Sequence, residues 1–260
     1  MKLCVGKKPI ILAIFLIIAA AVIAYAKSQY VVPVIMYHNI DENSGTSRLS
    51  VSPVNFERQM RFLKNRHYNV VSLEGLADMV IKNKFPGKTI AITFDDGYED
   101  NYLNAYPVLK KFGLRATIFI IPAMVGSRGY LTWDQIMEMS GSGVITIGSH
   151  SMTHPWLPSQ PEEKLAPEIA GSKRAIENKI GKDVNAFSYP QGGFNENVRK
   201  KVIEAGYKIS VATNPGKKYP RHDLFAMKRL RISSTSDNLF VFWIETTGFY
   251  TWIKEHRDKD

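Results

Sequence analysis

The sequence predicts an α/β fold, in which a parallel sheet or a barrel forms one domain behind an apolar N-terminal helix. About eight apolar stretches of strand length alternate with amphipathic stretches of helix length. The 260 residues are enough for one large α/β domain or for two small ones. Since no internal repeat, low-complexity tract or long linker divides the chain, we expect a single domain over residues 27–260.

Capping residues, glycines and prolines delimit the elements of the first half. Ser52-Pro53 begins a helix, because a capping residue is followed by proline in the first turn. Gly113 ends another helix, and Pro122 stops the strand that follows it. Together these signals predict strands at 30–37, 69–73, 89–94 and 116–121, and helices from 52, over 73–82 and over 101–112.

The second half continues the alternation. Thr132 to Gln135 matches a capping box, and Gly206 closes a later helix. Strands are predicted at 144–149, 184–189, 208–213 and 226–232, and helices from 132, over 159–180, 195–205 and, as the last element, 236–246.

Residues 1–26 are predicted to direct the protein out of the cytoplasm rather than to build its core. Lys2, Lys7 and Lys8 precede an unbroken apolar run over residues 10–26, whose 17 residues reach the lower edge of membrane-spanning length. The run ends in Ala-Tyr-Ala, a small-x-small pattern that a signal peptidase cleaves. We expect either a signal peptide or a membrane anchor, with the rest of the chain outside the cytoplasm, secreted or membrane-anchored.

Composition and missing motifs exclude several classes of function. The net charge is +10, but the basic residues are scattered and form no nucleic-acid motif, so we expect no nucleic-acid partner. Cys4 is the single cysteine, which excludes an intrachain disulfide and a thiolate metal site. No G-x-S-x-G elbow, P-loop or G-x-G-x-x-G occurs, so serine-hydrolase chemistry and a nucleotide cofactor have no support.

The main candidates for chemistry are Asp95 and Asp96, at the end of the apolar run 89–94. Two adjacent carboxylates at the mouth of a buried strand are costly to desolvate unless positive charge lies beside them. His150 and His154 follow another strand and can supply that charge by holding a zinc-like divalent ion with an open position for water. A free carboxylate beside such an ion can take the proton of that water, which predicts a metal-dependent hydrolase.

The candidates share one place in the predicted fold. His38, Asp95-Asp96, His150 and the segment Pro190-Gln191 all lie at or just past strand C-terminal ends. Active sites of α/β barrels lie on that face, so we expect these residues to meet there. On that face His38 can serve as a proton donor, although a histidine in the core remains the alternative.

The segments Thr93-Phe94-Asp95-Asp96-Gly97 and His150-Ser151-Met152-Thr153-His154 resemble the polysaccharide deacetylase family (NodB-type, carbohydrate esterase family 4). The resemblance covers residues 31–232, and the opening segment 32–38 is similar to the branch of biofilm poly-β-1,6-N-acetylglucosamine deacetylases. It implies a distorted (β/α) barrel of about seven parallel strands that removes acetyl groups from extracytoplasmic polysaccharides.

The resemblance also implies a role for each candidate residue. Asp95 is the expected general base, and one divalent ion is expected on Asp96, His150 and His154, most simply zinc, with cobalt, nickel or manganese as alternatives. The substrate and oxyanion group is expected at Tyr189, Pro190 and Gln191, with the Gln191 N–H as donor, and His38 is nominated as general acid.

The chain departs from the family pattern in three places. Ser188 stands where an arginine usually orients the base, Leu230-Arg231-Ile232 replaces a late Leu-x-His segment, and an aspartate–tryptophan motif is missing. The leading expectation is therefore an N-acetylglucosamine polysaccharide deacetylase, with a peptidoglycan or chitin-oligomer deacetylase as an alternative. A catalytically weak glycan-binding surface protein and a non-glycan amidohydrolase also remain open.

Overall fold

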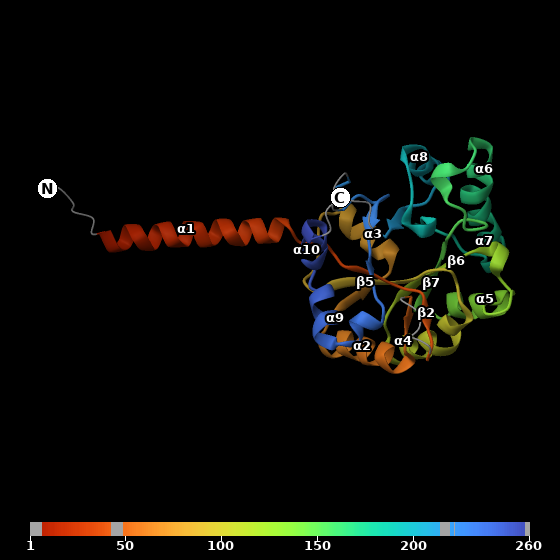
Figure 1. Cartoon of the computed structure of the whole chain (residues 1–260), viewed down its shortest axis with the longest axis horizontal. Coiled ribbons are helices and arrows are strands. Elements are labelled where there is room, and N and C mark those ends of the chain that lie inside the picture. Colours follow the sequence, from red (N-terminus) through yellow and green to blue (C-terminus); the bar gives the residue numbers. More distant parts are fainter. Residues whose placement is uncertain (1–6, 43–48, 214–218, 221, 258–260) are drawn as a thin grey trace.

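The computed structural model describes residues 7–42, 49–213, 219–220 and 222–257. Within that part of the chain, the main sheet has nine strands, all paired in parallel, and helices surround it (Figure 1). Its strands are β1 (Val34–Tyr37), β4 (Asn69–Val71), β5 (Thr89–Phe94), β6 (Ala116–Ile120), β7 (Ile145–Ser149), β8 (Ala186–Ser188), β9 (Ile209–Ala212), β10 (Met227–Lys228) and β11 (Leu230–Arg231).

The strand order shows a nearly closed barrel. Hydrogen-bonded neighbours run β10-β9-β8-β7-β6-β5-β1-β11, and β4 pairs with β5. The two edge strands, β10 and β11, follow one another in the chain and are separated by Arg229 alone. The predicted distorted (β/α) barrel in one domain is therefore confirmed, and its seam lies at Arg229.

The helices follow the strands as the alternation predicts. They are α2 (Pro53–Asn65), α3 (Leu73–Ile81), α4 (Tyr106–Phe112), α5 (Trp133–Gly141), α6 (Glu162–Ala166), α7 (Ser172–Ile180), α8 (Glu196–Glu204), α9 (Leu239–Glu245) and α10 (Tyr250–Arg257). Ser52 caps α2 by accepting a hydrogen bond from the Asn55 N–H, and Thr132 and Gln135 form the predicted capping box.

Several boundaries differ from the sequence prediction. The predicted helix 101–112 begins with a π-helical turn, η1 (Asn101–Ala105), and the predicted helix 159–180 contains another, η4 (Pro167–Gly171). The predicted strand 226–232 is broken into β10 and β11, and α10 follows the helix that was expected to be last. A small second sheet, β2 (Asn39–Ile40) with β3 (Ser50–Val51), was not predicted.

Alternation along the strands divides the core in two. Ile90, Ile92 and Phe94 of β5 belong to the larger cluster, which the helices cover, whereas Ala91 belongs to a second cluster on the opposite face. Phe119 of β6 fills that second face, and a Cβ at Gly148 would lie 2.4 Å from its ring. The barrel interior is therefore filled by side chains below the site.

The N-terminal helix α1 (Lys7–Ser28) projects away from the barrel (Figure 1). Within the described ranges, no helix combines the length and the hydropathy that a membrane crossing requires. Lys2, part of the predicted charged start of this segment, lies outside the described residues.

Candidate active site

The ends of four strands of the same sheet bring the predicted residues together, with β6 lying between β5 and β7. His38 follows β1, Asp95 follows β5, His150 follows β7 and Gln191 lies three residues beyond β8. All four line one cavity of about 280 Å³, whose lining among the described residues is Met36, His38, Leu49, Asp95, Asp96, His150, His154, Gln191, Gly192, Thr213 and Arg231. The face expected from parallel-strand topology is thus the face that carries the cavity.

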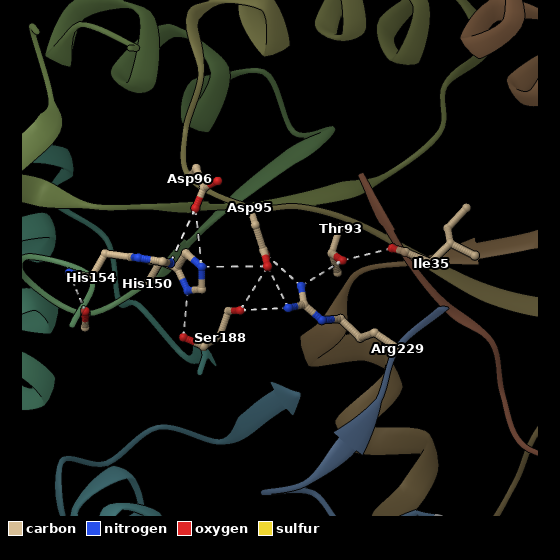
Figure 2. Close-up of polar contacts among 9 residues, drawn as sticks. Ile35, Thr93, Asp95, Asp96, His150, His154, Ser188 and Arg229 are labelled. Carbon is tan, nitrogen blue, oxygen red and sulfur yellow. Dashed lines mark hydrogen bonds and ion pairs between the residues drawn. The ribbon is translucent and has the colours of Figure 1, made fainter. Parts of the chain in front are cut away.

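Asp96, His150 and His154 form a three-residue group that can hold one metal ion (Figure 2). Their donor atoms all lie within 4.8 Å of one another. Asp96 Oδ1 is 3.5 Å from His150 Nε2 and 3.7 Å from His154 Nε2. Ligand bonds of about 2.1 Å in a tetrahedron place donors roughly 3.4 Å apart, so the spacing fits a zinc-like ion.

The backbone at two of these residues adopts an uncommon conformation. Asp96 has φ 72° and His154 has φ 61°, in the left-handed region that side chains other than glycine rarely enter. Strict alternation would send Asp96 to the face opposite Asp95, and this turn brings both carboxylates to the cavity. Gly97 also has φ 72°, and a Cβ there would lie 3.0 Å from Ile120 Cγ2. Such strain at a cluster of ligand-type residues is typical of functional sites.

Hydrogen bonding fixes the orientation of His150. Its Nδ1 lies 2.8 Å from the Ser188 carbonyl oxygen, which accepts a hydrogen bond when this nitrogen carries the proton and leaves Nε2 free as a ligand. Burial lowers the pKa of His150 although Asp95 and Asp96 oppose this, so the neutral ring is favoured. The neutral ring is the form that coordinates a metal.

Asp95 is held by Arg229 through two parallel hydrogen bonds (Figure 2). Arg229 Nη1 donates to Asp95 Oδ1 at 2.7 Å, and Nη2 donates to Oδ2 at 2.6 Å. The side chains are deeply buried, with Asp95 3% and Arg229 1% exposed. Burial alone would raise the pKa of Asp95, but the guanidinium and His150 outweigh it and hold the pKa well below its usual range.

Arg229 is not among the residues that the sequence predicts for the site, since Ser188 stands where the family usually has an arginine beside the base. Ser188 does stand in the place it was assigned, and its Oγ accepts a hydrogen bond from Arg229 Nη2 at 2.9 Å. The arginine comes instead from the barrel seam between β10 and β11. Two arginines at alternate positions of a predicted buried strand, Arg229 and Arg231, were the signal that could have identified it.

His38 lies partly buried at the edge of the cavity. Its Nδ1 is buried and has no hydrogen-bond partner among the described residues. Burial, together with the charges of Arg229 and Arg231, lowers the pKa of His38 more than the nearby Asp95 and Asp96 raise it. The structure thus places a titratable, unsatisfied ring beside the two carboxylates.

Of the three residues of the predicted oxyanion group, one lines the cavity. Gln191 lines the cavity and has φ 55°. Tyr189 is buried, its hydroxyl donates to the Phe225 carbonyl oxygen at 3.0 Å and its ring stacks on Phe194. Pro190 is also buried, and neither it nor Tyr189 lines the cavity. Of these three residues, the structure therefore brings only Gln191 to the cavity.

Comparison with known proteins agrees with this geometry. Residues 82–210 match the family model described as polysaccharide deacetylase. The chain is 38% identical over 216 residues to YxkH of Bacillus subtilis (strain 168), which bears the name of the same family, and the match covers 82% of this chain and 76% of YxkH.

Two further proteins relate the chain to named deacetylases. A poly-beta-1,6-N-acetyl-D-glucosamine N-deacetylase of Staphylococcus aureus (strain MRSA252) is 27% identical over 208 residues, or 75% of this chain and 72% of that protein. The structure of the Streptococcus pyogenes deacetylase PplD in complex with acetate superposes with a TM-score of 0.74 at 29% identity, covering 82% of this chain and 98% of PplD. By its sequence and its fold, this chain belongs to the polysaccharide deacetylase family.

Proposed function

We propose that the chain is a metal-dependent hydrolase that removes N-acetyl groups from an N-acetylglucosamine-containing polysaccharide outside the cytoplasm. The observation that carries this proposal is the group Asp96, His150 and His154 beside the buried carboxylate of Asp95. The similarity to a protein named as a poly-β-1,6-N-acetylglucosamine deacetylase supports the choice of sugar.

The donor set of one carboxylate and two imidazoles suits zinc, and cobalt, nickel or manganese accept the same ligands. A divalent ion held there supplies a water of lowered pKa and polarises the acetyl carbonyl. His150 keeps its Nε2 available for that ion through its contact with Ser188. The cavity is partly open to solvent, so a substrate can enter it.

Asp95 is the proposed general base. Its Oδ2 lies 3.7 Å from His150 Nε2, and Arg229 binds both of its oxygens, so we assign its carboxylate a place beside the proposed ligands and not among them. Arg229 keeps Asp95 ionised and fixes its two oxygens. The carboxylate is therefore ready to accept a proton from the attacking water at neutral pH.

Gln191 and His38 also line the cavity and are proposed to act on the substrate. The backbone N–H of Gln191 would stabilise the oxyanion of the tetrahedral intermediate, a contribution of roughly 3–4 kcal/mol for a good donor. His38, when protonated, would give a proton to the departing glucosamine nitrogen. The products are acetate and a glycan with a free amine.

The test is acetate release from a panel of acetylated glycans, with and without a chelator. We expect release from N-acetylglucosamine polymers that stops on chelation and returns when zinc is added. Binding of glycans without acetate release would instead indicate a surface protein, and activity on small amides alone would indicate an amidohydrolase; either result would refute the proposal.

The pH profile of the same assay tests His38. Because burial lowers the pKa of His38, its protonated form is lost at a pH below the ordinary 6.5. The rate should therefore fall as the pH rises through that lowered pKa, and His38→Gln should reduce turnover by about 10²–10⁴-fold and remove this limb. A variant with the wild-type rate and profile would exclude His38 as the acid.

The location outside the cytoplasm rests on the sequence of residues 1–26, in which basic residues precede an apolar run. A reporter enzyme that is active only after export, fused behind these residues, tests it. Activity equal to that of a fusion without them would contradict the proposal.

A further inference from the structure

A second arginine lines the cavity and is not used by the proposed chemistry. Arg231 belongs to β11 and lies opposite Met36 of β1. Its side chain is exposed, and it forms no hydrogen bond or ion pair with any residue that the structure describes. This distinguishes it from Arg229, whose guanidinium is bound to Asp95.

The charges of the cavity leave Arg231 uncompensated. Arg229 neutralises Asp95, and Asp96 faces the two histidines and any divalent ion that they hold. Among the described residues that line the cavity, no further acidic side chain occurs. With a divalent ion bound, the cavity therefore has a net positive charge, which attracts anions and repels the amine product.

The size of the cavity limits which part of a substrate Arg231 can contact. A volume of about 280 Å³ lies just below the usual range for ligand pockets, which begins near 300 Å³. Only a group on the reacting sugar or on its immediate neighbour is therefore within reach of this side chain. A guanidinium binds carboxylate and phosphate oxygens in pairs, and it has no comparable partner on a neutral sugar.

We propose that Arg231 selects acetylated glycans that carry a carboxylate or a phosphate on the N-acetylated sugar or next to it. This inference rests on the proposed deacetylase function and narrows its substrate class to anionic glycans.

The experiment compares the wild type, Arg231→Gln and Arg231→Lys on three matched sets of N-acetylglucosamine oligomers. One set is neutral, one carries a lactyl carboxylate on the neighbouring sugar and one carries a phosphodiester. We expect kcat/KM on at least one anionic set to exceed that on the neutral set by roughly 10–100-fold in the wild type. Arg231→Gln should lose this preference and Arg231→Lys should keep part of it.

Two features identify the role as substrate selection. The loss in Arg231→Gln should appear in KM on the anionic oligomers, since the anion does not react, with little change on the neutral ones. Added salt should weaken the preference in the wild type. Arg174→Gln, which changes an exposed arginine of α7, is the matched control and should behave as the wild type. Methyl esterification of the carboxylate should abolish the preference for that set.

The outcomes separate this inference from the function on which it rests. Equal rates on neutral and anionic oligomers, or an equal loss of kcat on all sets in Arg231→Gln, would overturn the role of Arg231 while leaving the deacetylase in place. If no oligomer releases acetate, the proposed function fails. Calorimetric binding of the three oligomer sets then still tests Arg231, since unchanged affinity for the anionic sets in Arg231→Gln would refute it.

Discussion

Asp95→Asn is expected to bind its metal ion as the wild type does and to release acetate about 10²–10⁴-fold more slowly. The amide cannot accept the proton of the attacking water, whereas Asp96, His150 and His154 are unchanged. Acetate release and bound zinc, measured on the same preparation, check the two halves of this expectation.

A control variant separates lost chemistry from lost structure. Asp95→Asn leaves the buried guanidinium of Arg229 without its anion, which costs about 3–5 kcal/mol of stability. Asp95→Asn combined with Arg229→Gln removes both charges, so it should regain stability without regaining activity. Wild-type turnover in either variant would exclude Asp95 as the base.

Arg229→Gln is expected to lose both stability and activity. The carboxylate of Asp95, 3% exposed, would remain buried with no cation bound to its two oxygens, at a cost of about 3–5 kcal/mol. Its pKa would rise, because burial is the largest influence on it and Arg229 is the main opposing one. A protonated Asp95 is no base, so we expect turnover to fall by about 10²-fold or more at neutral pH.

The contribution of the Asp95–Arg229 ion pair to the stability of the protein should decrease at acidic pH. The folded state lowers the pKa of Asp95, so the ion pair stabilises the protein fully at a pH above the pKa that Asp95 has in the unfolded chain. This stabilisation is lost as the pH falls through the lower pKa that Asp95 has in the folded protein. Denaturant unfolding between neutral and acidic pH should show this loss in the wild type and not in the double variant. Additive effects of the two single substitutions would contradict a direct coupling between Asp95 and Arg229.

Local signals in the sequence predicted most elements and a parallel sheet or barrel, and the resemblance to the family implied the distorted barrel. The strand Thr89–Phe94 agrees with its prediction, and Ser52 and Thr132 cap helices as expected. The broken strand 226–232 was not predicted, because periodicity cannot show that its halves pair with opposite edges of the sheet. The π-helical turns η1 and η4 were not predicted either, because hydrophobic periodicity does not distinguish such a turn from the α-helix around it.

Part of the site could also be predicted. Asp95, Asp96, His150 and His154 are recognisable because ligand-type residues follow buried strands, and parallel topology brings strand ends together. Arg229 was not predicted, because its partner Asp95 lies 134 positions away in the chain and no local sequence pattern indicates that the two residues pair. Tyr189 was assigned to the substrate by its neighbours in sequence, whereas strand alternation turns its side chain into the core.

The central claim is that Asp96, His150 and His154 share one ion on which hydrolysis depends. The most direct test is the zinc content per chain of the wild type and of His154→Ala, measured with acetate release on the same samples, with Asp95→Asn as the variant that keeps its ion. We predict one zinc per wild-type chain and the joint loss of zinc and activity in His154→Ala. Zinc content and turnover equal to those of the wild type in His154→Ala would contradict the account.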